Sequence, residues 1–136
     1  MNITRNGLIA VFSLSLWSSA TYSDTRTSGL SVASLSRKWN LEEYSYLFFT
    51  EAPGDQEAND YLFLKNDMSF TSVSEGLYEE GKWRLDVAKR RIHLSVKGDN
   101  EELVFIVHDL DGNELILVID DPNDKEAGDL KIHFKS

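Results

Sequence analysis

Apolar and polar residues alternate with a period of two along much of the chain. The alternation is clearest over residues 91–97 and 129–135, and it places apolar side chains on one face of a half-buried strand. Three further runs, at 61–64, 103–107 and 115–119, are apolar throughout. They are short and rich in β-branched or aromatic residues, which favours strands over helices. Their second faces are therefore expected to be covered or to contact a partner.

Turn-forming residues separate these runs at short spacing. Asn66-Asp67 and the segments 98–100 and 111–113, which contain Gly, Asp and Asn, are typical of tight hairpin turns. The pattern predicts strands at about 38–50, 61–65, 68–74, 77–85, 91–97, 102–109, 114–120 and 129–135. No interval is long enough for a crossover helix, so neighbouring strands are expected to pair antiparallel.

A closed barrel is the fold that removes the exposed edges of such a series of strands. We therefore predict an all-β, eight-stranded antiparallel up-and-down meander barrel over residues 35–136. An open sheet or a flattened sandwich is the alternative. Residues 24–34 are interpreted as a flexible lead-in, in which Leu30, Val32 and Leu35 could form one helical turn under the barrel.

The first 23 residues have the features of a secretory signal peptide. Arg5 is followed by an uncharged, mostly apolar stretch at 8–17 and then by small residues. The apolar stretch is about half as long as a membrane-spanning helix, which disfavours an uncleaved anchor. Cleavage after Ala20 or after Ser23 would export the protein, either to the periplasm or out of the cell.

Composition and charge narrow the classes of partner. The chain has 136 residues, 23 of them acidic and 14 basic, for a formal net charge of -9. This length suits one domain. The acidic balance argues against nucleic acid or an anionic membrane as a partner, because phosphates would be repelled. The absence of cysteine excludes disulfides, thiolate chemistry and a lipid-modified cysteine anchor.

Two tryptophans lie in short motifs. Trp39 stands in the segment 35–41, and Trp83 follows Gly81-Lys82. With the predicted strands, this order resembles the small bacterial lipocalin-like domains of secreted proteins, a branch of the calycin barrels. The resemblance covers residues 35–136 and implies that Trp39 and Trp83 are structural plugs in the barrel. Arg37 stands where the first Gly-x-Trp motif of that family has glycine, and the chain lacks both the Thr-Asp-Tyr signature of animal lipocalins and the carboxylate-holding Arg-x-Tyr pair of fatty-acid-binding proteins.

The sequence contains no recognisable catalytic constellation. His93 and His133 share the polar parity of their strands and are expected on the outer face, while His108 ends an apolar run. No Gly-x-Ser-x-Gly elbow or phosphate-binding glycine loop is present. We therefore expect no enzyme activity, no cofactor and no metal site. The acidic segments 109–113 and 120–129 offer weak calcium binding as an alternative, but a hairpin turn and a solubilising loop explain them better.

The barrel interior is the remaining candidate site. An eight-stranded barrel either is packed with side chains or holds one small ligand, and an apolar lining would suit a lipophilic guest. The predicted ligand-binding residues of the interior and mouth are Leu41, Tyr44, Tyr46, Tyr61, Phe63, Phe70, Leu85, Leu94, Phe105 and Phe134. The acidic connection at 51–60 could cover the open end as a lid or be a plain surface loop.

These features predict a secreted or periplasmic binding module for a small apolar molecule. The alternative is a packed barrel that acts on a protein partner, as an interaction or inhibitor module. Its contact surface would be the outer apolar faces of 103–107 and 115–119.

Overall fold

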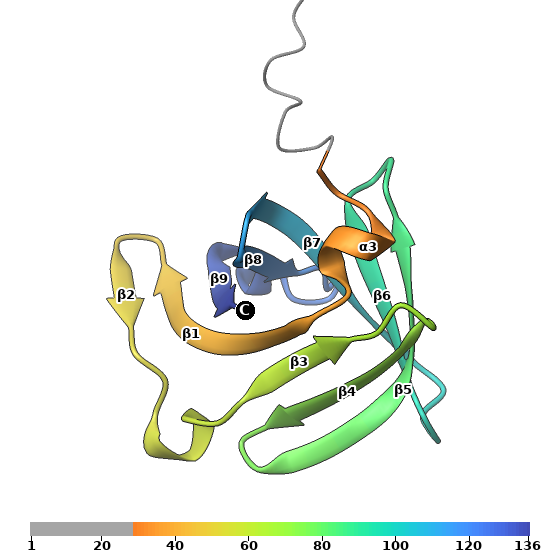
Figure 1. Cartoon of the computed structure of the whole chain (residues 1–136). Helices are drawn as coiled ribbons and strands as arrows, with labels where there is room; N and C mark the ends of the chain where they lie inside the picture. The colour runs from red at the N-terminus through yellow and green to blue at the C-terminus, as the bar shows by residue number, and fades with distance from the viewer. Residues whose placement is uncertain (1–28) are drawn as a thin grey trace, which may run out of the picture.

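The computed structural model describes residues 29–136. The predicted signal peptide and the first part of the predicted lead-in lie outside the described residues. The described chain begins with a short helix, α3 (Val32–Leu35), and also contains two 3-10 turns, η3 (Asp55–Glu57) and η4 (Lys125–Asp129) (Figure 1). The strands are β1 (Lys38–Tyr46), β2 (Phe49–Glu51), β3 (Tyr61–Leu64), β4 (Ser69–Ser74), β5 (Leu77–Asp86), β6 (Arg91–Val96), β7 (Glu102–Asp111), β8 (Glu114–Ile119) and β9 (Leu130–Lys135). No helix within residues 29–136 has the length and apolarity to cross a membrane.

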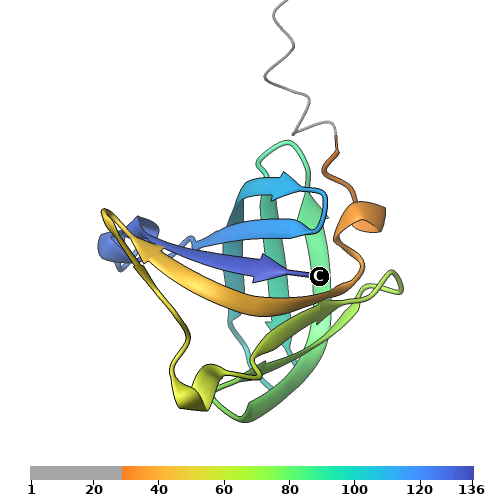
Figure 2. The same ribbon diagram turned by 60° about the vertical axis from the view of Figure 1, so that its left-hand side comes forward.

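The strands form one antiparallel meander that closes on itself. The sheet order is β2-β1-β3-β4-β5-β6-β7-β8-β9, and β9 also pairs with β1. Strand β1 and strands β3 to β9 therefore make an eight-stranded barrel, as Figure 2 shows, with β2 added to the edge of β1. The predicted fold class is confirmed.

One predicted strand, at 38–50, is wrong in its extent. The chain turns back at Leu47-Phe48, so that Tyr46 pairs with Phe49 in a β1–β2 hairpin. Leu47 has a φ of 53°, a left-handed conformation that non-glycine residues adopt infrequently. No Gly, Asn, Asp or Pro marks this turn in the sequence, which is why the pattern did not predict it.

Two β-bulges change which face of a strand points inward. The register of β1 against β9 shifts between Leu41 and Glu43, and that of β7 against β8 shifts between Val107 and Asp109. A bulge inserts one residue and switches the alternation beyond it. The bulge in β1 brings Tyr44 into register with Ile132, on the inner face. Strand β7 also continues to Asp111, two residues beyond the predicted end.

One end of the barrel is closed by tryptophans and by the helical turn. Trp39 and Trp83 are buried, and their indole Nε1 atoms donate to the backbone oxygens of Leu35 (3.0 Å) and Lys65 (2.8 Å). The helical turn expected near Leu35 forms as α3 and packs Leu30 and Leu35 into the core. Side-chain burial with satisfied N–H groups makes this end a packed core.

Gly81 allows a close approach of strands and side chains at the packed end. A Cβ atom there would lie 2.0 Å from the backbone oxygen of Ser95 and 3.0 Å from Phe70 Cε1. No other residue fits without a backbone shift, which accounts for the glycine of the Gly-x-Trp motif by sterics alone.

The three continuous apolar runs each divide between the two faces. Phe105, Val107, Leu115 and Leu117 are buried inside. The outward residues of 103–107 and 115–119 do not form the exposed contact surface of the alternative prediction: Val104, Ile106 and Ile116 are half-buried and Val118 is only 8% exposed.

Neighbouring long side chains account for the partial burial of these outward apolar residues. Arg91, Ile106, Val118 and Lys131 are successive cross-strand partners. The aliphatic stems of Arg91 and Lys131 therefore flank the apolar pair, as such side chains commonly do.

Candidate functional site

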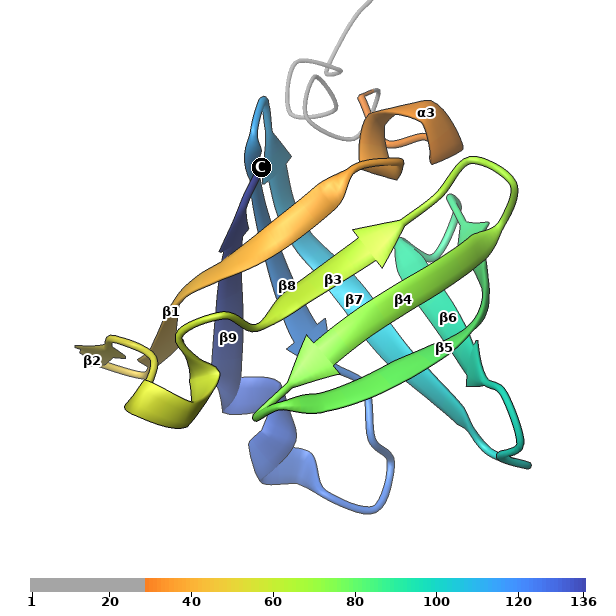
Figure 3. The same ribbon diagram turned by 60° about the horizontal axis from the view of Figure 1, so that its bottom comes forward.

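A cavity of about 350 Å³ opens at the end of the barrel opposite α3. Figure 3 shows the β1–β2 hairpin, η3 and η4 gathered at this end, whereas α3 lies at the other. The cavity is lined by Leu41, Tyr44, Asp60, Tyr61, Leu62, Ser72, Val73, Ser74, Glu79, Leu94, Leu103, Phe105, Ile119, Leu130, Ile132 and Phe134. Most of these residues belong to the open-end halves of the strands, whereas Leu41 and Phe134, which pair with each other, lie deeper in the barrel.

Strands β6 to β9 make one apolar wall of the cavity. Leu94, Leu103 and Phe105 come from β6 and β7, and Ile119, Leu130, Ile132 and Phe134 come from β8 and β9. Leu103 faces inward opposite Leu94 and yet is 41% exposed. An inward leucine that solvent can reach marks the rim of the opening.

Strands β3 to β5 make a polar wall on the other side. Glu79 shares the parity of Gly81 and Trp83 on β5, and Ser72 shares that of Phe70 on β4. Ser72 and Glu79 are direct cross-strand partners. Asp60 precedes β3 with the parity of Leu62. Alternation therefore directs Asp60, Ser72, Ser74 and Glu79 into the cavity.

Asp60 is the buried charged residue of this wall. Its side chain is 7% exposed, and Oδ1 accepts a hydrogen bond from the backbone N–H of Glu75 at 2.9 Å. Burial raises the pKa of Asp60 above its usual value, the bond from Glu75 opposes this, and the nearby charge of Glu57 adds to the increase. The fold therefore holds this carboxylate where ionisation is unfavourable.

Tyr44 and η3 form the adjoining part of the rim. The Tyr44 hydroxyl donates to Glu57 Oε2 at 2.5 Å, and Glu57 Oε1 accepts from the backbone N–H of Gly54 at 3.1 Å. Burial and the hydrogen bond to Glu57 raise the pKa of Tyr44 far above its usual value. Tyr44 is thus a neutral hydrogen-bonding group, and the segment 54–57 is anchored to the rim.

Six of the ten predicted ligand-binding residues line this cavity. They are Leu41, Tyr44, Tyr61, Leu94, Phe105 and Phe134. Tyr61 does so at the edge only, because its ring lies beneath Lys38, with Nζ 4.4 Å from the ring centroid.

The other four predicted residues lie elsewhere. Phe63 faces outward, 5.2 Å from Lys65 Nζ, because the register of β3 turns Leu62 and Leu64 inward instead. Phe70 and Leu85 pack in the core of the closed half, below the cavity. Tyr46 extends past the rim into the β1–β2 hairpin, where it is exposed.

Sequence reasoning missed the polar wall. Parity offered a signal, because a buried Trp83 implies that Glu79, four residues earlier on the same strand, also faces inward. The same argument connects Asp60 to Leu62. Asp60 ends the 51–60 connection, which the sequence predicts to be a lid or a surface loop, and the sequence pattern assigns no role to Glu79.

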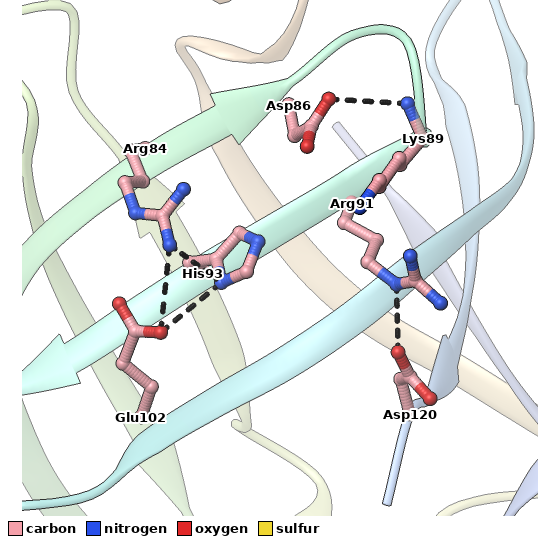
Figure 4. Close-up of polar contacts among 7 residues, drawn as sticks. All are labelled: Arg84, Asp86, Lys89, Arg91, His93, Glu102 and Asp120. Carbon is pink, nitrogen blue, oxygen red and sulfur yellow. Dashed lines mark hydrogen bonds and ion pairs between the residues drawn. The ribbon is translucent and has the colours of Figure 1, made fainter.

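The three histidines do not converge. On the outer face, His93 Nδ1 lies 3.2 Å from Glu102 Oε1 and 3.2 Å from Arg84 Nη2, as Figure 4 shows. His133 contacts Ser45 Oγ at 2.8 Å. His108 stands at the bulge of β7, and burial lowers its pKa.

Acidic side chains of the segment 120–129 form an ion pair and local hydrogen bonds to the backbone. Asp120 forms an ion pair with Arg91 at 2.7 Å (Figure 4). Asp121 and Asp124 accept hydrogen bonds from the backbone two residues further on, which are typical of Asx turns. Within residues 29–136, no group of three or more His, Cys, Asp or Glu side chains is arranged to hold a metal ion.

Comparison with known proteins yields a similarity of fold. No protein-family model matches the chain, and no curated protein matches its sequence. The crystal structure of a DUF4847 family protein from Bacteroides vulgatus ATCC 8482 is similar, with a TM-score of 0.53 and 14% sequence identity over 74% of this chain and 92% of that chain. At this identity the likeness concerns the barrel alone.

Proposed function

We propose that the protein is a secreted or periplasmic lipocalin-like binding module that holds a small apolar ligand at the barrel mouth. The observation that carries this proposal is the cavity of about 350 Å³ with its continuous apolar wall. Its size falls within the usual range of small-molecule sites, about 300–1,000 Å³, and such sites combine apolar walls with a few polar groups. The signal-peptide pattern at residues 1–23 supports export, and the proposal assigns no reaction to the barrel.

Titration with the neutral dye Nile red, whose emission rises in apolar surroundings, tests this function. We expect saturable binding to the protein and its loss in Leu103→Trp, because a larger side chain at the half-exposed rim would occupy the opening. Val87→Trp is the matched control, since Val87 is also exposed but follows β5 at the closed end. Absence of saturable binding, or equal binding by Leu103→Trp, would contradict the proposal.

A second function, interaction with a protein partner, is favoured by the β1–β2 hairpin. Leu47, Phe48 and Phe49 project from its tip, and Phe48 is 95% exposed. Contiguous exposed apolar side chains commonly mark interaction sites. In this alternative the hairpin, and not the outer faces of β7 and β8, is the contact surface.

Crosslinking in the cell envelope of the host tests the alternative. A defined crosslinked partner should be lost when Phe48 and Phe49 are changed to serine and retained in Val87→Ser. If the unaltered protein forms no adduct, or the double variant retains it, this second function is wrong.

A further inference from the structure

We propose that the ligand of the barrel mouth carries a protonated amine, which binds between Asp60 and Glu79. This inference rests on the proposed binding function and adds the chemical class of the guest: an amphiphile with an apolar body and a cationic head. The two walls of the cavity match these two parts of the molecule.

The two acidic residues line the same cavity from β3 and β5, with β4 running between them. Asp60 precedes β3, where Leu62 pairs with Ser72 of β4, and Ser72 in turn pairs with Glu79 of β5. Continued by one residue, the β3–β4 register places Ser74 opposite Asp60, so Ser74 and Ser72 of β4 separate the two acidic positions on the inner face. Carboxylates and hydroxyls in this arrangement accept the several hydrogen bonds that an ammonium group donates.

Both carboxylates keep oxygen atoms that accept no hydrogen bond from another described residue. Among the described residues, the carboxylate of Asp60 accepts one hydrogen bond, through Oδ1 from the backbone N–H of Glu75, and the side chain of Glu79 forms no hydrogen bond or ion pair. Asp60 is more than nine-tenths buried and lines the cavity. Its second oxygen is thus available to a ligand.

The charged residues around the cavity favour a ligand whose head group is positively charged. None of the described residues that line it is Lys or Arg, whereas Asp60 and Glu79 both face it and Glu57 lies beside it at Tyr44. A buried carboxylate is stabilised by a nearby cation and destabilised by a second anion. A ligand amine supplies the missing cation, and a fatty-acid carboxylate would be repelled.

Calorimetric titration with three ligands of equal chain length tests the inference. n-Decylamine, n-decanol and sodium decanoate differ only in the head group and are added at pH 7, below their micelle concentrations, to the protein purified from its host. We expect decylamine to bind about tenfold or more tightly than decanol, since hydrogen bonds to charged groups exceed neutral ones by this order. Decanoate should bind more weakly than either.

Conservative variants assign the preference to the two carboxylates. Asp60→Asn and Glu79→Gln keep the shape of the wall, and each should weaken decylamine binding about tenfold while decanol binding changes less than about twofold. Glu80→Gln is the control, because Glu80 is the next residue on β5, faces outward and pairs with Lys97 at 3.7 Å. It should leave all three affinities unchanged.

The outcomes separate this inference from the function on which it rests. If decanol and decanoate bind as well as decylamine, or if the two variants leave decylamine binding intact, the amine class is wrong while the apolar site stands. If none of the three ligands binds and Nile red also fails to bind, the proposed function itself is wrong.

Discussion

The two ends of the barrel are built from opposite kinds of contact. At the closed end, Trp39 and Trp83 are buried with their N–H groups bonded to backbone oxygens, and α3 seals the core. At the open end, Leu103 is inward and yet reachable by solvent, and Asp60 is a carboxyl group kept in a buried position. The closed end satisfies its indole N–H groups internally, whereas at the open end the carboxylates of Asp60 and Glu79 line a cavity.

Under the proposed function, this difference assigns stability to the closed end and binding to the open end. Residues of the closed half fill space and are expected to dominate the free energy of unfolding. Residues of the mouth include groups that stabilise the fold little, as functional sites often do. Substitutions at the two ends should therefore have separable effects.

The largest effect is expected from Trp83→Ala. Removing this buried indole leaves a cavity at the closed end, which we expect to lower the free energy of unfolding by about 3–5 kcal/mol. Urea denaturation followed by circular dichroism measures it. Tyr78→Ala, on the same strand but exposed, is the control and should change stability by about 0.5 kcal/mol or less. A loss below about 1 kcal/mol for Trp83→Ala would show that the closed end does not depend on this residue.

Gly81→Ala should have the next largest effect. The added Cβ would collide with the backbone oxygen of Ser95, and overpacking of this kind costs about 1–3 kcal/mol. Gly128→Ala is the matched control, because a Cβ there meets nothing within 4 Å. Equal denaturation midpoints for the two variants would contradict the close approach of the strands.

Leu103→Ala is expected to separate binding from stability. Its partial exposure at the rim limits the loss of stability to less than about 1 kcal/mol, but the apolar wall loses contact area. Nile red affinity should fall several-fold in this variant and stay constant in Val87→Ala. Unfolding comparable to that of Trp83→Ala would indicate that the mouth is part of the packed core.

Asp60→Asn is expected to have the smallest effect on the free energy of unfolding. The direction of the change is informative, because we expect this substitution not to destabilise the protein. Because the folded-state pKa of Asp60 is raised, the wild-type protein loses stability as the pH increases from the unfolded-state pKa, about 3.9, through the folded-state pKa. Asparagine stays neutral and can still accept from Glu75. Its denaturation midpoint at pH 7 should therefore equal or exceed that of the wild type, and a lower midpoint would contradict the cost of ionising Asp60.

Local patterning was sufficient to predict the barrel but not all of its inner surface. Alternation along 91–97 and 129–135 fixed the inward residues of β6 and β9, and turn residues separated most strands. In the continuous run 61–64, both faces are apolar, so Phe63 could not be distinguished from its neighbours by sequence. The bulges at Glu42 and His108 depend on pairing with β9 and β8, and the turn at Leu47 has no local signal.

The polar wall escaped prediction for a different reason. Asp60 and Glu79 look like surface residues because burial of an acid is unfavourable in general. Alternation from Trp83 and Leu62 indicates their inward direction, but the closed topology is needed to place both side chains at one cavity. The predicted Tyr44 was placed at the mouth by sequence, but its inward direction depends on the bulge in β1.

Native mass spectrometry of the protein purified from its own host tests the ligand-binding role of the mouth most directly. We predict a population heavier than the polypeptide by the mass of a small molecule, released on gentle collisional activation and absent from Leu103→Trp. A wild-type spectrum with the polypeptide mass alone, or the same added mass in Leu103→Trp, would contradict the assignment of the open end as a binding site.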